Sequence, residues 1–317
     1  MKNVVVMGEC MVEFAPDEKN NYKQAFAGDV YNTAVYLKRL LKGSIDVSFL
    51  TAVGKDFMSK SMVNDFRMNN INTQLVKCVS DKQPGAYLIQ ISDSGERNFV
   101  YWRDTSAAKY TISQLSTNEK NKLIEHCDFF YFSGISIAIL DKNELTEFWK
   151  LVTDLRNTGA KIVFDSNFRS SLWSDHDDAK LQFFKAYTLS DIVFAGAEDF
   201  YLLYQFNSFI EIDHFLCDFS IDEIIIKNGA NGVFYRSTTE QFIFDTNPVD
   251  NVIDTTSAGD AFNSGFLSAK LSCYNAVEAI EQACRLSEVV IQHRGAIIDE
   301  KAFSDFIGSH RVSITVS

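Results

Sequence analysis

The chain contains only three prolines in 317 residues, and no low-complexity segment divides it. With so few prolines and no low-complexity segment, we expect neither a disordered tail nor a long linker. No apolar run approaches the roughly 20 residues that a membrane-spanning helix needs. The first apolar run, residues 4–7, is also too short for a signal peptide. We therefore expect one domain over residues 1–317, located in the cytoplasm.

Several enzyme signatures are missing. The chain has no G-x-x-x-x-G-K-[ST] segment, no G-x-G-x-x-G after its first apolar run and no G-x-S-x-G. These absences argue against P-loop enzymes, nicotinamide enzymes and α/β-hydrolases. The six cysteines form no C-x-x-C, and the five histidines form no pair at metal-ligand spacing. We expect the cysteines to be small core residues in a reducing compartment.

Basic residues are too few to balance the acidic ones. The chain has 30 Lys and Arg against 42 Asp and Glu, for a net charge of −12. This balance argues against nucleic acid or an anionic membrane as the main partner. It does not argue against ATP as a ligand, because a metal ion and local backbone amides can bind the phosphates.

Buried strands alternate with helices along most of the chain. Continuous apolar runs, the pattern of strands covered on both faces, lie at residues 4–7, 47–50, 129–132, 162–164, 192–194 and 224–226. Helical periodicity lies between them, at residues 31–41, 57–69, 144–157, 180–188 and 199–205. Shorter strands at 233–236 and 241–244 precede three C-terminal helices. This order predicts an α/β fold with a mainly parallel sheet flanked by helices, and ligands beyond the carboxyl ends of the strands.

Two regions break the alternation. Short strand-like pieces at residues 10–14 and 22–26 flank a polar turn at 16–21, and runs at 86–91 and 98–103 are joined by a hairpin signal at 92–97. Together they predict a small sheet outside the main one, from about residues 10–26 and 86–103. Such a sheet needs something to cover its apolar face. Substrate and a second subunit are the two candidates.

The segment DTTSAGD, residues 254–260, leads into the apolar-periodic stretch AFNSGF. This pattern predicts a loop that opens a helix, where unpaired N–H groups and the helix dipole favour an anion. A carboxylate at such a place would repel phosphate, so its presence suggests a role in the reaction itself. Asp260 is suited to take a proton from an attacking hydroxyl. The structural alternative is an ordinary N-terminal cap.

The run DTTSAGDAFNSGF resembles the C-terminal signature of the ribokinase-like (PfkB) carbohydrate kinases. The resemblance implies that Asp260 is the catalytic base and that the amides of Ala258, Gly259 and Asp260 form an anion hole. It also places Ser257 and Gly259 at the nucleotide. The family usually has Gly where Ser257 stands, so the loop must adopt a conformation that serine tolerates. The family fold includes a small β-sheet lid, which matches the two strand pairs.

The segment AGDVYN, residues 27–32, opens the first predicted helix. Gly28 or Asp29 can cap this helix, and Asn32 lies one turn further in, which is sufficient as a purely structural account. The resemblance implies instead that Gly28, Asp29 and Asn32 bind sugar hydroxyls. Ala27 stands where the family often has a second glycine.

Tyr87, Tyr101 and Arg103 lie on the two predicted hairpin strands. Tyr101 and Arg103 are two residues apart and share a face. A planar guanidinium suits a carboxylate ligand, although an arginine on a strand is more often merely solvated. Segments 9–11, 95–103 and 294–298 (ECM, GERNFVYWR and RGAII) resemble the 2-keto-3-deoxygluconate kinases within the family. This resemblance implies that the three side chains contact a sugar acid.

The segment DSNFR, residues 165–169, directly follows a predicted strand, which suggests a ligand site. Asp, Ser and Asn are also common in turns, so a simple turn is the structural alternative. The resemblance places Asn167 at the nucleotide phosphates, Arg169 at the substrate and Asp165 near the metal. No metal ligand is assigned firmly. Gly196 and Asp199 occupy the place of the family's Asn-x-x-Glu motif, and neither receives a role.

The segment KNGANG, residues 227–232, follows the next strand along the chain. A tight turn explains its glycines without any ligand. The resemblance implies that Lys227, Gly229 and Gly232 contact the nucleotide.

The resemblance as a whole implies an ATP-dependent kinase that converts 2-keto-3-deoxygluconate to its 6-phosphate with Mg²⁺. It leaves a monovalent-cation requirement open and implies a dimer formed through the lid. One alternative is a fructokinase or another sugar kinase of the family. The alternative from a different class is a sugar-binding regulator without catalytic activity.

Overall fold

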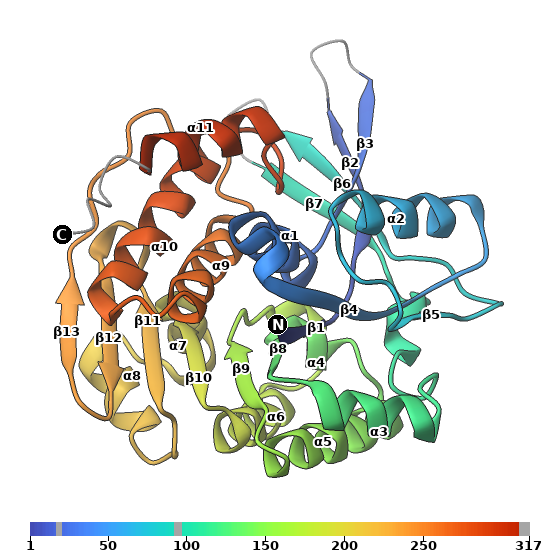
Figure 1. Cartoon of the computed structure of the whole chain (residues 1–317), viewed down its shortest axis with the longest axis horizontal. Coiled ribbons are helices and arrows are strands. Elements are labelled where there is room, and N and C mark those ends of the chain that lie inside the picture. Colours follow the sequence, from blue (N-terminus) through green and yellow to red (C-terminus); the bar gives the residue numbers. More distant parts are fainter. Residues whose placement is uncertain (17–20, 92–96, 311–317) are drawn as a thin grey trace.

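The predicted parallel sheet lies at the centre of the molecule (Figure 1). A computed structural model describes residues 1–16, 21–91 and 97–310, and in them nine strands lie in the order β13-β12-β11-β10-β9-β8-β1-β4-β5. The strands are β1 (Lys2–Met7), β4 (Ile45–Val53), β5 (Val76–Cys78), β8 (Phe129–Ser133), β9 (Lys161–Asp165), β10 (Ile192–Gly196), β11 (Glu223–Lys227), β12 (Val233–Ser237) and β13 (Gln241–Phe244). Neighbouring strands are parallel except β11–β12 and β12–β13, which are antiparallel.

Alternate residues of the central strands enter two hydrophobic cores, one on each side of the sheet. In β1, Val5 and Met7 belong to one core, whereas Val4 and Val6 belong to the other. The first core is covered by α3 (Thr117–His126), α4 (Gly134–Ala138), α5 (Lys142–Asn157), α6 (His176–Leu189), α7 (Ala197–Tyr204) and α8 (Phe209–Leu216). The second is covered by α1 (Asp29–Leu41), α2 (Phe57–Met68), α9 (Ala258–Leu271) and α10 (Ala276–Ile291). Helix α11 (Glu300–His310) packs on α1, α9 and α10 through a third cluster.

The helices predicted from periodicity are confirmed within a few residues, and so are the three C-terminal helices. Helices α3, α4 and α8 and the edge strand β5 were not predicted. Helix α3 buries only Leu123 and begins at a capping box between Ser116 and Glu119, so it carries little apolar periodicity. Helix α6 begins earlier than predicted because Asp175 caps its polar first turn. Nowhere in the described ranges is a helix long and apolar enough to cross a bilayer.

A second sheet stands apart from the first, as predicted, and projects from one side of the molecule (Figure 1). We call it the lid sheet; its order is β3-β2-β6-β7, with β2 (Met11–Pro16), β3 (Tyr22–Ala27), β6 (Ala86–Ile91) and β7 (Arg97–Trp102). The two predicted hairpins are joined by parallel pairing of β2 with β6. The predicted turn residues 17–20 and 92–96 lie outside the described residues. Glu13, Tyr87 and Tyr101 are paired across the strands and share one face of this sheet.

Five neighbouring strands of the central sheet end side by side. Ser133, Asp165, Gly196 and Lys227 are the last residues of β8, β9, β10 and β11, and Glu9 stands two residues after the end of β1. The register places Ser133 opposite Asp165 and Gly196 opposite Lys227. Polar side chains from distant parts of the chain therefore meet at one edge of the sheet, where α/β folds bind their ligands.

Candidate active site

Asp260 lies in the first turn of α9, and its residue surface is only 7% exposed. Asn32 Nδ2 donates to Asp260 Oδ2 at 2.9 Å, and Ser257 Oγ donates to the same oxygen at 3.0 Å. Ser257, the N-cap, makes no side-chain capping bond. The carboxylate is thus held by two side chains inside the protein, which differs from the ordinary cap that was the structural alternative.

Burial is the main cause of an unusual pKa at this carboxyl. It raises the pKa of Asp260, the negative charges of Asp29 and Asp165 raise it further, and the hydrogen bonds from Asn32 and Ser257 lower it, leaving a value of about 7. A carboxylate with a pKa near neutrality accepts a proton far more readily than an exposed aspartate does. The geometry and charge of Asp260 therefore suit a general base.

The first turn of α9 supplies backbone donors beside Asp260. Ala258 and Gly259 are partly exposed, so a ligand can approach them. Ala258 N–H donates to the Thr255 carbonyl at 3.2 Å, and the anion hole formed by the amides of Ala258, Gly259 and Asp260 stays a prediction. Gly259 and Asp260 follow it in the turn, where the helix offers no intrahelical acceptor for an N–H group. Ser257 has φ −117°, an ordinary value for an L-residue, so serine fits where the family has glycine.

Lys227 links the end of β11 to this turn. Its Nζ donates to Asp165 Oδ1 at 3.0 Å and to Asn263 Oδ1 at 2.9 Å. A Cβ atom placed on Gly259 would lie 3.6 Å from the Lys227 Nζ atom, so the ammonium stands beside the first turn of α9. Asn263 was not predicted as a site residue, although it lies inside the signature that was quoted. An ammonium and backbone donors side by side form a site for phosphate.

Asp29 occupies the first position of α1 and does not cap it; Gly28 is the N-cap. The Asp29 carboxylate accepts hydrogen bonds from Ser133 Oγ at 2.5 Å and from Asn167 Nδ2 at 2.9 Å, while burial raises its pKa. Asn167 thus contacts Asp29, and its predicted contact with nucleotide phosphates stays a prediction. Gly28 permits a close approach of two segments, because a Cβ atom there would lie 2.3 Å from the Glu9 carbonyl oxygen.

Asp199, which received no role from the sequence, is buried in the first turn of α7. Ser166 Oγ donates to its carboxylate at 2.6 Å and accepts the Gly196 N–H at 2.9 Å. Burial raises the pKa of Asp199 to about 6. Arg169 Nη1 donates to the Phe168 carbonyl at 3.0 Å and lies 4.0 Å from the Asp199 carboxylate, and the Arg169 side chain is 56% exposed, so a ligand can reach this guanidinium.

Arg103 has a partner that sequence reasoning missed. Its guanidinium pairs with the carboxylate of Glu9, and the two side chains are 10% and 1% exposed. Glu9 Oε1 and Arg103 Nε have no hydrogen-bond partner among the described residues. A Cβ atom at Gly85 would lie 2.6 Å from Glu9 Oε1, so glycine is needed there. Only the polar break after the first strand, Gly8 and Glu9, hinted at this pair.

The tyrosines of the lid sheet stand beside Arg103. The Arg103 guanidinium lies 5.9 Å from the centre of the Tyr101 ring, and the Tyr101 and Tyr87 rings are 5.7 Å apart. Tyr87 is buried and donates to the Glu13 carboxylate, whereas Tyr101 is 49% exposed. The structure therefore brings the three predicted lid residues together, with Tyr101 as the most accessible.

The two glycines of the KNGANG segment form the turn between β11 and β12. Gly229 has φ +53° and Gly232 has φ +97°, values that favour glycine over other residues. A Cβ atom at Gly232 would also lie 2.9 Å from the Phe244 carbonyl oxygen. The turn explains both glycines, and their contact with a nucleotide stays a prediction.

The site fits nucleotide phosphates better than a bare metal ion. Among the described residues no group of three or more His, Cys, Asp or Glu side chains is arranged to hold a metal. Lys227 and the amides of the α9 turn instead suit the phosphates, and Asp165 and Asp199 lie at the same edge of the sheet. Mg²⁺ is commonly held through one or two carboxylates together with substrate phosphates, which is compatible with this set of residues.

Comparison with known proteins agrees with this geometry. A family model described as pfkB family carbohydrate kinase matches residues 1–302. The chain is 36% identical to a 2-dehydro-3-deoxygluconokinase of Haemophilus influenzae, covering 96% of this chain and 98% of the relative, and 30% identical to one of Escherichia coli K12, covering 95% and 98%. A crystal structure of a putative ribokinase II from E. coli in complex with ATP and Mg²⁺ has a TM-score of 0.83 at 20% identity, covering 98% of this chain and 100% of that one.

Proposed function

The chain belongs to the pfkB family of carbohydrate kinases, and from this premise we propose that it transfers the γ-phosphoryl group of ATP to 2-dehydro-3-deoxygluconate (2-keto-3-deoxygluconate). The family uses ATP. The identity of the sugar acid is supported by the relatives, which are 30–36% identical over nearly the whole chain. A monovalent-cation requirement is a separate prediction, to be tested by comparing turnover in potassium and in tetramethylammonium salts.

The observation that carries the proposal is the buried carboxyl of Asp260, with its pKa of about 7, beside the free amides of the α9 turn. Asp260 accepts the proton of the primary hydroxyl at C6 while the oxygen attacks the γ-phosphorus. A new O–P bond forms, the bond to the β–γ bridging oxygen breaks, and ADP leaves. Asn32 and Ser257 fix the base through Oδ2.

Negative charge that develops on the transferred phosphoryl group would be stabilised by hydrogen-bond donors already fixed in place. The amides of Gly259 and Asp260 and the Lys227 ammonium are aligned before the reaction, so they need no reorganisation. Mg²⁺ bound to the nucleotide would supply further positive charge at the phosphates. The lid sheet supplies the other wall, where closure over the sugar would exclude water as a competing acceptor.

The two arginines near the sugar differ in what they can offer a carboxylate. Arg103 is already neutralised by Glu9 in a buried ion pair. By itself, this pair is as compatible with a neutral sugar such as fructose as it is with a sugar acid. Arg169 lies 4.0 Å from Asp199 and is largely exposed. We therefore assign recognition of the sugar-acid carboxylate chiefly to Arg169.

The substitution Arg169→Met separates these alternatives. We expect kcat/KM for 2-dehydro-3-deoxygluconate to fall about 10- to 100-fold, because a charge-assisted hydrogen bond is lost, while kcat/KM for fructose stays within about threefold. Coupled ADP detection on a panel of sugars and sugar acids measures both. Arg285→Met is the control, since Arg285 is a comparably exposed arginine on α10, paired with Glu281. A wild-type enzyme that prefers fructose would contradict the assignment of the substrate.

We also propose that two copies associate through the outer face of the lid sheet. Val100 and Trp102 lie on the face opposite Tyr87 and Tyr101 and are 37% and 56% exposed. Trp102→Glu is expected to shift the protein from dimer to monomer in light scattering coupled to gel filtration, because burying a carboxylate there is unfavourable. Phe184→Glu on α6, where the ring is 55% exposed, is the control and should leave the mass unchanged. A monomeric wild-type protein would refute the proposal.

A further inference from the structure

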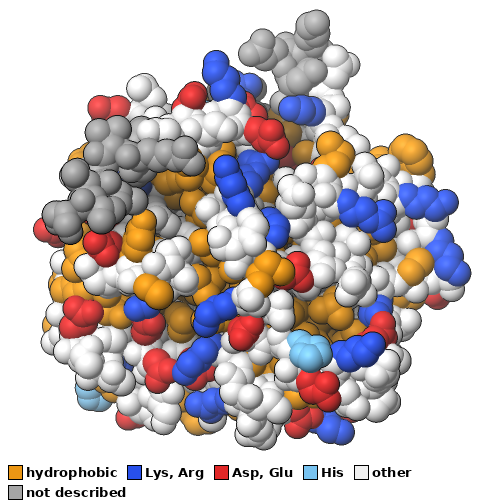
Figure 2. Space-filling model, in the orientation of Figure 1, with side chains coloured by type: hydrophobic (Ala, Val, Ile, Leu, Met, Phe, Trp, Pro, Cys, Tyr) orange, Lys and Arg blue, Asp and Glu red, His pale blue; other side chains and the backbone are white. Residues whose placement is uncertain are grey.

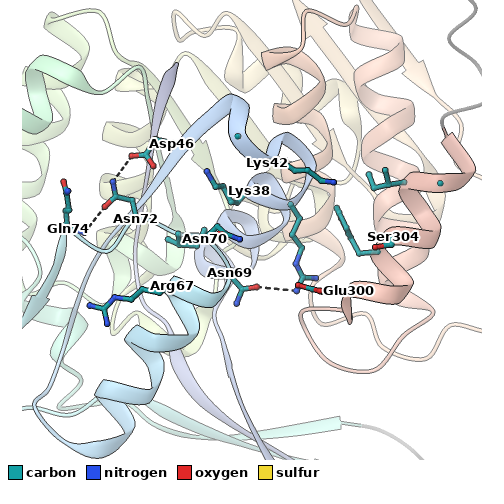
Figure 3. Close-up of a pocket in the computed structure, with 16 residues that line it drawn as sticks. Lys38, Lys42, Asp46, Arg67, Asn69, Asn70, Asn72, Gln74, Glu300 and Ser304 are labelled. Carbon is teal, nitrogen blue, oxygen red and sulfur yellow. Dashed lines mark hydrogen bonds between the residues drawn. The ribbon is translucent and has the colours of Figure 1, made fainter.

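A second pocket lies away from the kinase site, between the carboxyl end of α1, the segment after α2 and helix α11 (Figure 3). Its volume is about 1030 Å³. Asn32, which holds Asp260, and Lys42, which lines the pocket, are separated by ten residues of α1 and its end, about 15 Å along a helix axis. The pocket is therefore a separate place on the molecule, and neither the family nor the proposed reaction accounts for it.

The pocket carries positive charge on an acidic protein. Its charged lining residues are Lys38, Arg39, Lys42, Arg67, Asp46 and Glu300. Four cations face two carboxylates there, although the chain as a whole has a net charge of −12. Figure 2 shows Lys and Arg side chains close together on this face, over the position that α1 has in Figure 1. A local positive field of this kind concentrates anions.

Two of the four cations are held in position by backbone carbonyl groups. Lys38 Nζ donates to the Ile45 carbonyl at 2.8 Å, and Arg39 Nη1 donates to the Ile298 carbonyl at 2.6 Å. Both acceptors are uncharged. Lys38 lies in the last turn of α1 and Lys42 is its C-cap, so both cations stand at the carboxyl end of this helix. Within residues 1–16, 21–91 and 97–310, none of the four cations forms an ion pair with a carboxylate.

The remaining lining suits a small organic molecule. The segment 69–74 contributes four amide side chains, which both donate and accept hydrogen bonds, and Figure 3 shows several of them along the pocket. Asn72 Nδ2 donates to Asp46 Oδ2 at 2.8 Å, so one of the two carboxylates already has a partner. Ile71 and Phe303 add apolar surface. A cavity lined mainly by cations and amide side chains, with a smaller apolar part, suits a small polar molecule.

We propose that this pocket binds a small polyanionic metabolite, one that carries phosphate or several carboxylate groups. The anionic groups would lie against Lys42 and Lys38 at the end of α1, and the polar body would contact the amides of segment 69–74. Binding places anionic groups beside these cations and leaves the kinase site free. The proposal does not depend on which sugar the kinase phosphorylates.

The test uses inorganic pyrophosphate, titrated calorimetrically into the full chain in Mg²⁺-free buffer with saturating ADP to occupy the nucleotide site. We expect wild type to bind pyrophosphate and the variant Lys42→Glu/Arg67→Glu to bind it at least tenfold more weakly. Lys60→Glu/Lys122→Glu changes the charge of the chain by the same amount at exposed positions outside the pocket, and should bind like wild type.

Two results would overturn the proposal. One is wild-type protein that takes up no pyrophosphate once ADP is bound. The other is equal weakening in both double variants, which would show that total charge and not the pocket governs binding. Circular dichroism of the double variants controls for folding, and Lys42 and Arg67 are exposed side chains whose replacement is not expected to disturb the core.

Discussion

Asp260→Asn is expected to lower kcat by roughly 10² to 10⁴ while leaving the KM values for ATP and sugar nearly unchanged, because the amide cannot accept the hydroxyl proton. Asparagine keeps the size of the side chain and can still accept the hydrogen bond from Asn32. In wild type, kcat should rise with pH through about 7, the pKa of the Asp260 carboxyl, since only the deprotonated form is a base. Initial rates from pH 5.5 to 8.5 measure both effects.

The same substitution has a predicted effect on stability that a purely structural role would not give. The pKa of Asp260 is raised in the folded protein, from an ordinary 3.8 to about 7. Between these values the folded state binds more protons than the unfolded state, so this group's contribution to stability falls as pH rises. Asparagine carries no such penalty. The variant should therefore be more stable than wild type above pH 7, by about 4 kcal/mol, with the difference shrinking toward pH 5.

Retained turnover in Asp260→Asn would remove the proposed mechanism. Loss of turnover in wild type itself, with sugar binding intact, would instead support the sugar-binding regulator. A variant that is less stable than wild type at pH 8 would show that the carboxylate is not buried as described. Denaturant unfolding at the two pH values decides this point independently of any activity.

Arg103→Met is expected to destabilise the protein by about 3–5 kcal/mol, because it leaves the Glu9 carboxylate buried without its partner. The Glu9 side chain is only 1% exposed, so water cannot replace the guanidinium without a local opening. Urea unfolding followed by tryptophan fluorescence measures the loss. Most of it should be recovered in Glu9→Met/Arg103→Met, since a buried ion pair is often replaceable by apolar side chains.

Activity and stability should separate in this pair of variants. The double variant is expected to regain stability but not the wild-type KM for the sugar, because it lacks Arg103, which is predicted to contact the sugar acid. Equal stability of Arg103→Met and wild type would contradict the buried pair. Full recovery of the KM in the double variant would limit the pair to a structural role.

The sequence predicted the parts of the fold that follow from local patterns. Runs such as residues 129–132 and 192–194 are apolar on every residue because both faces of those strands are buried, and they were located correctly. Strand β5 has three residues and no fully buried one, and helix α3 buries a single leucine, so neither carries enough periodicity to be recognised.

Contacts between residues far apart in the sequence could not be predicted from local patterns. Lys227 and Asn263 were each visible in the sequence, but their contact depends on how α9 packs against the sheet. The Glu9–Arg103 pair joins the end of β1 to the lid sheet and could not be inferred from either segment alone. The raised pKa of Asp260 has the same origin, because it depends on burial and on two other carboxylates supplied by separate strands and helices.

The parallel pairing of β2 with β6 has a consequence for how the chain assembles. These two strands are far apart in the sequence, because β4 and α2 lie between them and are synthesised before β6. Contacts so distant in sequence form late, since the loop entropy must be lost before the pairing is gained. The pairing of β1 with β8 joins residues still further apart, Val4 and Phe129, so the middle of the central sheet forms late as well. Because the lid sheet has its own strand pairing, separate from the central sheet, it can open and close in the native state as a cooperative unit, without unfolding of the body that carries the base.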